Sequence, residues 1–133
     1  MKTGNESGRD VTAADPEEAI VSLRETSLGN ILVDARGLTL YLFTSDKDAS
    51  STCYEGCVEY WPPLETLGKP VAGDGIDATK LGVSARTDGT AMVTFNGHPL
   101  YYFIKDSNAG DVAGQGYGNV WYVVDANGNA ITS

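Results

Sequence analysis

Residues 29–61 read GNILVDARGLTLYLFTSDKDASSTCYEGCVEYW, and residues 89–121 read GTAMVTFNGHPLYYFIKDSNAGDVAGQGYGNVW. The two stretches align without a gap and share ten identities, mostly glycines, aromatic residues and aspartates. The identical pairs are Gly29/Gly89, Val33/Val93, Gly37/Gly97, Leu40/Leu100, Tyr41/Tyr101, Phe43/Phe103, Asp46/Asp106, Ala49/Ala109, Gly56/Gly116 and Trp61/Trp121. Because a solenoid needs about three or more copies, two copies predict a tandem duplication that builds one pseudo-twofold domain.

Length and composition favour a single all-β domain. With 133 residues in total, neither repeat is long enough to bury a core of its own, so we expect the two repeats to share one. Sixteen glycines and seven tyrosines are typical of strands joined by tight turns. We therefore predict short antiparallel meanders that form one compact barrel or sandwich.

The charge of the chain excludes two classes of partner. Eighteen acidic residues face nine basic ones, which gives a net charge of −9. Nucleic-acid binding needs clustered Lys and Arg, and anionic membrane surfaces attract the same residues, so we expect neither partner. A soluble protein outside the cytoplasm is the simplest interpretation, with cation binding or a saline habitat as alternatives.

Alternating apolar and polar residues predict the positions of the strands. They fall at residues 20–25, 30–34, 39–44, 81–86, 91–95, 100–104 and 120–124. Gly37 and the dipeptide Asn96-Gly97 predict hairpin turns. Pro62 and Pro63 remove two ladder donors from the segment that matches the last strand, so we expect Trp61 to anchor a loop or a chain crossing.

The chain divides into a leader and one domain. Residues 1–14 are polar and predict a flexible leader. Residues 15–133 are expected to form a single two-repeat domain, with a helical turn near residues 15–19. Its parts are repeat one (about 20–64), a connector (65–80) and repeat two (about 81–131), with a small helical insert near Cys53 and Cys57.

Cys53 and Cys57 are the only cysteines, and their spacing fits a local disulfide, two metal ligands or two buried thiols. The chain has a single histidine, His98, which disfavours a closed zinc site. We favour the disulfide, which requires export from the cytoplasm. Repeat two has Ala113 and Tyr117 at the matching positions, so the shared scaffold does not depend on the pair.

A motif Tyr-x-Phe-x-x-Asp occurs once in each repeat. On a strand, Tyr and Phe two positions apart share one face, and the Asp comes where the strand ends. In one interpretation the aromatic residues pack in the core and each Asp caps the following turn. In the other, the motifs form an aromatic ledge with a carboxylate at its rim that binds a sugar, a peptide or a planar cofactor. The candidate ligand-binding residues are Tyr41, Phe43, Asp46, Tyr101, Phe103 and Asp106.

Candidate metal ligands follow the two motifs. Acidic side chains alternate there as in the first half of a calcium loop, but the sixth-position Gly and the twelfth-position Glu of such a loop are missing. The chain also contains residue types that bind copper, namely a histidine, a methionine (Met92) and two cysteines. We predict no cofactor, with calcium, copper or haem as open alternatives. The candidate ligands are Asp46, Asp48, Asp106, Asp111 and His98.

Nothing in the sequence predicts catalysis. It lacks a nucleophile elbow, and no Ser or Cys pairs with the histidine in a pattern typical of a catalytic nucleophile. Asp46 and Asp106 are the carboxylates available for glycoside chemistry, but only the repeat symmetry makes them a pair. We therefore expect a protein that is not an enzyme.

The chain resembles a family of bacterial and archaeal secreted-repeat lipoproteins of unknown function, recognised by a Tyr-x-aromatic-x-x-Asp motif. The resemblance covers about residues 29–128. It is carried by GNILVDARGLTLYLF (29–43), by Cys53, Cys57 and WPPL (61–64), by NGHPLYYF (96–103), and by GQG (114–116) with VWYV (120–123). It implies export to the cell surface or periplasm, usually with a lipidated N-terminal cysteine. We expect membrane attachment only through such an anchor, and residues 1–14 contain no cysteine.

Taken together, the sequence predicts an extracytoplasmic, lipoprotein-derived domain for non-enzymatic binding or surface presentation. The expected partner is a cell-surface protein, a polysaccharide or a small ligand. The alternative is a metal- or haem-associated accessory protein in extracytoplasmic electron transfer or copper handling.

Overall fold

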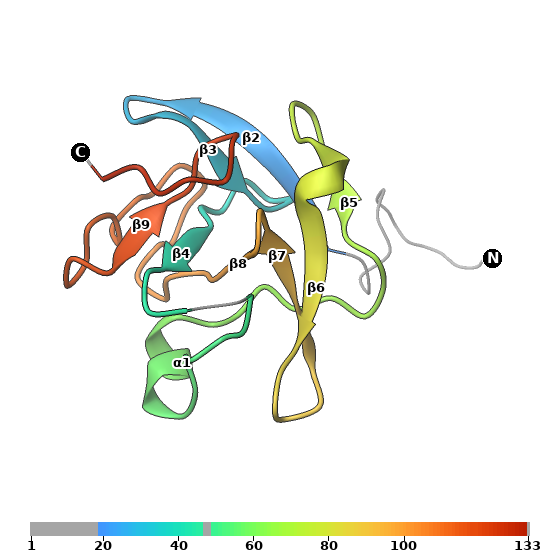
Figure 1. Cartoon of the computed structure of the whole chain (residues 1–133). Helices are drawn as coiled ribbons and strands as arrows, with labels where there is room; N and C mark the ends of the chain where they lie inside the picture. The colour runs from blue at the N-terminus through green and yellow to red at the C-terminus, as the bar shows by residue number, and fades with distance from the viewer. Residues whose placement is uncertain (1–18, 47–48, 133) are drawn as a thin grey trace, which may run out of the picture.

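The computed structural model describes residues 19–46 and 49–132 (Figure 1). The leader predicted for residues 1–14, and all of the predicted helical turn except Ala19, lie outside these ranges. The described elements are β2 (Ile20–Thr26), β3 (Gly29–Val33), β4 (Tyr41–Phe43), α1 (Gly56–Tyr60), β5 (Val71–Ala72), the 3-10 turn η1 (Ala78–Lys80), β6 (Leu81–Ala85), β7 (Ala91–Phe95), β8 (His98–Pro99) and β9 (Trp121–Val123). The all-β prediction is confirmed, and α1 is the small helical insert beside the cysteines.

The strands form three small sheets, in the orders β3-β2-β5, β4-β9 and β6-β7-β8. The hairpins β2–β3 and β6–β7 are antiparallel, whereas β5 lies parallel to β2. Strand β5 and turn η1 fall within residues 65–80, which the sequence predicted to be a connector. An open strand edge presents unpaired backbone groups, and β5 covers that edge of β2.

The two repeats exchange their final segments. Strand β4 of repeat one pairs with β9 of repeat two, and Tyr101 of repeat two pairs with Pro63 of repeat one. The predicted meander is present where the third segment of each repeat begins, since Thr39 pairs with Val33 and β8 pairs with β7. Further along, the third segment pairs with the other repeat. The strand predicted at 100–104 is reduced to a bridge at Tyr101, because its partner segment contains Pro62 and Pro63, which have no N–H to donate.

Strand pairing also corrects the gapless repeat alignment. Leu23 pairs with Leu32 in the first hairpin, and Val83 pairs with Val93 in the second. Val83 follows Leu23 by sixty positions, but Val93 follows Leu32 by sixty-one, so the identity Val33/Val93 does not join structural counterparts. The loop before β7 is one residue longer than the loop before β3. The turn after β7 is one residue shorter than the turn after β3. Because a one-residue slip would turn every side chain to the other face, this compensation keeps Leu32 and Val93 in the same core.

Alternation along β4 divides the interior into two clusters. Leu40 and Leu42 face an aliphatic cluster, while Tyr41 and Phe43 face an aromatic one. The turn at Gly37 connects β3 to β4, and the turn at Gly97 connects β7 to β8, as predicted. The φ angles of these two glycines are positive, at 89° and 80°. The polar groups of both motifs thus lie on the aromatic side of the molecule.

Candidate functional site

Four aromatic rings form a stack at the centre of the aromatic cluster, which we call the aromatic column. Its order is Phe43, Trp121, Trp61 and Phe103, with centroid separations of 4.2, 3.8 and 4.2 Å. The two tryptophan rings at its centre are parallel to within 2°. Each phenylalanine therefore stacks on the tryptophan of the other repeat, and Trp61 anchors the chain crossing as predicted.

The motif tyrosines and aspartates bond across the two repeats. The Tyr41 hydroxyl donates to Asp106 Oδ2 at 2.6 Å, and the Tyr101 hydroxyl donates to Asp46 Oδ2 at 2.6 Å. The backbone N–H groups of Tyr41 and Tyr101 donate to each other's carbonyl oxygens at 2.8 and 2.9 Å. This reciprocal pattern is that of a twofold interface, here within one chain. We call the two hydrogen bonds the crossed Tyr–Asp pairs.

The second carboxylate oxygen of each motif aspartate holds the loop that follows it. Asp46 Oδ1 accepts from the backbone N–H and the hydroxyl of Thr52, and Asp106 Oδ1 accepts from the N–H of Ala113. The packing interpretation predicted that each aspartate caps the turn that follows it. The backbone N–H groups that the two aspartates bind lie six and seven residues downstream. The ligand-binding interpretation of the same residues stays a prediction.

Burial controls the protonation of the crossed Tyr–Asp pairs. Tyr41 and Tyr101 are both fully buried, and burial raises the pKa of each hydroxyl well above its ordinary value. Burial also raises the pKa of Asp106, although the hydrogen bond from Tyr41 acts in the opposite direction. The tyrosines therefore remain neutral donors in the folded protein.

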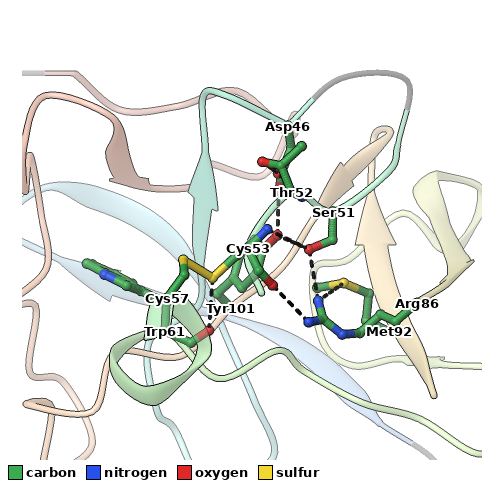
Figure 2. Close-up of a disulfide and its surroundings, with 9 residues drawn as sticks. All are labelled: Asp46, Ser51, Thr52, Cys53, Cys57, Trp61, Arg86, Met92 and Tyr101. Carbon is green, nitrogen blue, oxygen red and sulfur yellow. Dashed lines mark hydrogen bonds between the residues drawn. A yellow bond between two sulfur atoms is a disulfide. The ribbon is translucent and has the colours of Figure 1, made fainter. Parts of the chain in front are cut away.

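The cysteines form the predicted disulfide, with an S–S distance of 2.06 Å (Figure 2). The loop that carries it is tied to a crossed pair, because Ser51 Oγ lies 2.6 Å from the Tyr101 hydroxyl. Arg86 donates to Ser51 Oγ and to the Cys53 carbonyl, both at 2.8 Å. Sequence reasoning assigned no role to Ser51 or Arg86, because the fold alone brings these two residues together.

Helix α1 contributes residues to two hollows in the surface. One, which we call the aromatic hollow, has a volume of about 380 Å³. The other, the arginine hollow, has a volume of about 660 Å³. The aromatic hollow is lined by Phe43, Cys57, Tyr60, Trp61, Lys105, Tyr117 and Trp121. The arginine hollow is lined by Tyr54, Glu55, Val58, Pro63, Glu65, Arg86, Thr87 and Asp88.

The six predicted ligand-binding residues are distributed between the interior and the surface. Tyr41 and Tyr101 are enclosed, and Phe43 reaches the aromatic hollow. Phe103 and Asp106 line a smaller hollow of about 170 Å³. The structure thus brings the motifs together at the pseudo-twofold axis, but exposes only part of them.

The predicted metal ligands are dispersed. Asp48 lies outside the described residues, and Asp111 accepts from the backbone of Ser107 and Asn108. His98 lies on β8 and lines neither hollow beside α1. In residues 19–46 and 49–132 no group of three or more His, Cys, Asp or Glu is placed to hold a metal ion. Calcium, copper and haem binding stay predictions without a supporting contact.

A family model described as a secreted repeat of unknown function matches the chain twice, over residues 22–65 and 82–125. The chain belongs to this family. The two matches fall on the two repeats, and the resemblance noted in the sequence is confirmed. Searches of curated proteins and of solved structures gave no match. Within the described part of this secreted-repeat protein, no helix is long and apolar enough to cross a membrane.

The aromatic column predicts a steric requirement at Gly114. The Gly114 N–H donates to the Tyr41 hydroxyl, and a Cβ at this position would lie 2.7 Å from the Trp61 ring and 3.0 Å from the Tyr41 ring. We expect Gly114→Ala to lower the free energy of unfolding by about 1–3 kcal/mol, measured by urea denaturation. Gly56→Ala is the matched control, because its Cβ would meet nothing within 4 Å and alanine favours the helix. Equal stability of the two variants would contradict this packing.

Two buried tyrosines, Tyr41 and Tyr101, and the half-buried Tyr102 predict an alkaline transition. The pKa values of Tyr41, Tyr101 and Tyr102 are raised, chiefly by burial, so the native state favours their neutral form. Their contribution to stability is complete below the unfolded-state pKa of about 10 and is lost as the pH rises above it. We expect these three tyrosines to ionise only as the protein unfolds, measured by tyrosinate absorbance beside circular dichroism. Ionisation of all seven tyrosines in a protein that keeps its native circular dichroism would contradict the burial.

Proposed function

We propose that this secreted-repeat protein is a non-enzymatic binding domain that acts outside the cytoplasm and holds a ring-bearing ligand in the aromatic hollow. The observation that supports the proposal most strongly is the exposure of Tyr60 and Tyr117, which are 55% and 52% accessible where they line this hollow. Exposed aromatic side chains that converge on a concave surface are typical of binding sites.

The lining of the hollow indicates which ligand would fit. Trp61 and Trp121 contribute to it, but both residues are 4% exposed and their rings are stacked on each other. Tyr60, Tyr117 and the half-buried Phe43 therefore offer the contact area for a flat ring. Among the described lining residues Lys105 alone is charged, so an acidic group on the ligand would be its natural partner.

Two further observations support binding rather than catalysis. The polar groups of the motifs are already engaged with each other, which leaves Tyr41 and Tyr101 without a free hydroxyl proton to transfer. The disulfide fits an oxidising compartment, in agreement with the family description. We further propose that the full-length protein is lipid-anchored at the cell surface or in the periplasm, as the sequence resemblance implies.

Tryptophan fluorescence tests the proposal, because Trp61 and Trp121 are the only tryptophans and both line the hollow. The probes are phenylacetate and glucuronate, each a ring with a carboxylate, and phenethylamine, a ring with a cation. We expect saturable quenching or enhancement by one of the carboxylates and a weaker response to phenethylamine. Lys105→Gln should reduce the affinity for the carboxylate about tenfold, the change expected for a lost charged hydrogen bond.

Variants locate the binding and provide the control. Tyr117→Ala should abolish the response while the protein remains folded, since the Tyr117 side chain is half exposed. Leu67→Ala removes a side chain that is 84% exposed and lies outside the hollow, and should bind like the unmodified protein. Lack of any saturable response, or a response that survives Tyr117→Ala, would refute the aromatic hollow as the binding site.

A further inference from the structure

Arg86 is a buried cation that lines the arginine hollow. Its side chain is 2% exposed, although arginine is rarely enclosed unless its donors are paired. One terminal nitrogen donates to Ser51 Oγ at 2.8 Å and approaches the sulfur of Met92 at 3.7 Å, and the other donates to the Cys53 carbonyl (Figure 2). The guanidinium lies 4.2 Å from the centre of the Tyr54 ring.

One donor of this guanidinium is unsatisfied. Arg86 Nε is buried and has no hydrogen-bond partner within the described residues. The Asp88 carboxylate is 4.0 Å away, which is too far for a hydrogen bond, and its other oxygen is occupied by Thr90. A buried donor without an acceptor destabilises the folded state, more so when it carries charge. The site is therefore short of one acceptor.

The arginine hollow is where that acceptor can enter. Arg86 is the only cation among its described lining residues, whereas Glu55, Glu65 and Asp88 contribute three carboxylates. These carboxylates repel an anion, and a simple cation has no acceptor to offer Nε. A hydroxyl group both donates and accepts, so a ligand with several hydroxyls satisfies the arginine and the carboxylates together.

We propose that the arginine hollow is a second binding site, specific for a neutral, hydroxyl-rich ligand such as a sugar residue. One ligand oxygen accepts from Arg86 Nε, and neighbouring hydroxyls donate to Glu65 and Asp88. The side chain of Asp88 is 55% exposed and can turn outward to admit the ligand. The arginine hollow shares no lining residue with the aromatic hollow, so the two proposals stand or fall separately.

The Nε–H resonance of Arg86 in the nitrogen-15 NMR spectrum reports on this site directly. The probes are glucose, N-acetylglucosamine, a glucose oligosaccharide, acetate, methylammonium and the neutral amide N-methylacetamide. We expect a saturable shift of the Arg86 signal with a neutral sugar and none of the Arg36 signal, since Arg36 is 69% exposed and lies outside the hollow. Tighter binding of the oligosaccharide than of glucose would identify a polysaccharide as the source of the sugar, and the reverse a free sugar.

Charge-neutralising variants decide between specific and general effects. Glu65→Gln and Asp88→Asn should each weaken sugar binding about tenfold, as expected for a hydrogen bond to a charged group. Glu25→Gln makes the same change in net charge on the β2–β3 hairpin, far from α1 (Figure 1), and should leave the affinity unchanged. The proposal is overturned if no sugar shifts the Arg86 signal, if only acetate, methylammonium or the amide does so, or if Glu25→Gln weakens binding as much as Glu65→Gln.

Discussion

The fold depends on two hydrogen bonds that each repeat makes to the other. A Tyr hydroxyl buried without a partner would destabilise the protein, and the half-buried carboxylates of Asp106 and Asp46 accept from the buried hydroxyls of Tyr41 and Tyr101. A hydrogen bond to a charged group contributes about 1.5–3 kcal/mol, a substantial part of the net stability of a small domain. Since donor and acceptor come from different repeats, neither repeat can satisfy its own motif.

The same reciprocity organises the core around the axis. The aromatic column alternates the two repeats, and the final segment of each repeat pairs with the motif-bearing segment of the other. The repeats therefore share one core because each supplies what the other lacks. This explains why two segments of this length form one domain.

Departures from the pseudo-twofold symmetry create the surface that is available for binding. The disulfide and α1 occur in repeat one alone, and each hollow beside α1 includes residues of that insert. Arg86, from repeat two, reaches across to hold the insert in place. In this view the repeated residues maintain the scaffold, and the unrepeated insert adds to it the residues that distinguish the two hollows.

The sequence predicted the parts of this structure that follow from local patterns. Each of these parts can be recognised from a few neighbouring residues: the hairpin turn at Asn96-Gly97, the alternation along β4 and the spacing of the disulfide. The exchange between repeats was not predictable in this way, because Tyr41 lies sixty-five residues from Asp106 and the motif alone does not say which Asp it meets. The burial of Arg86 was not predictable either, since it depends on Ser51 and Cys53, which are brought to it only by the fold.

Double-mutant cycles on the motif test the exchange between repeats most directly. One cycle combines Tyr41→Phe with Asp106→Asn, the partner in the other repeat, and the second combines Tyr41→Phe with Asp46→Asn, the aspartate of the same motif. The crossed pairing predicts a coupling free energy of about 1–3 kcal/mol in the first cycle and of less than about 0.5 kcal/mol in the second. A larger coupling between Tyr41 and Asp46 than between Tyr41 and Asp106 would contradict it.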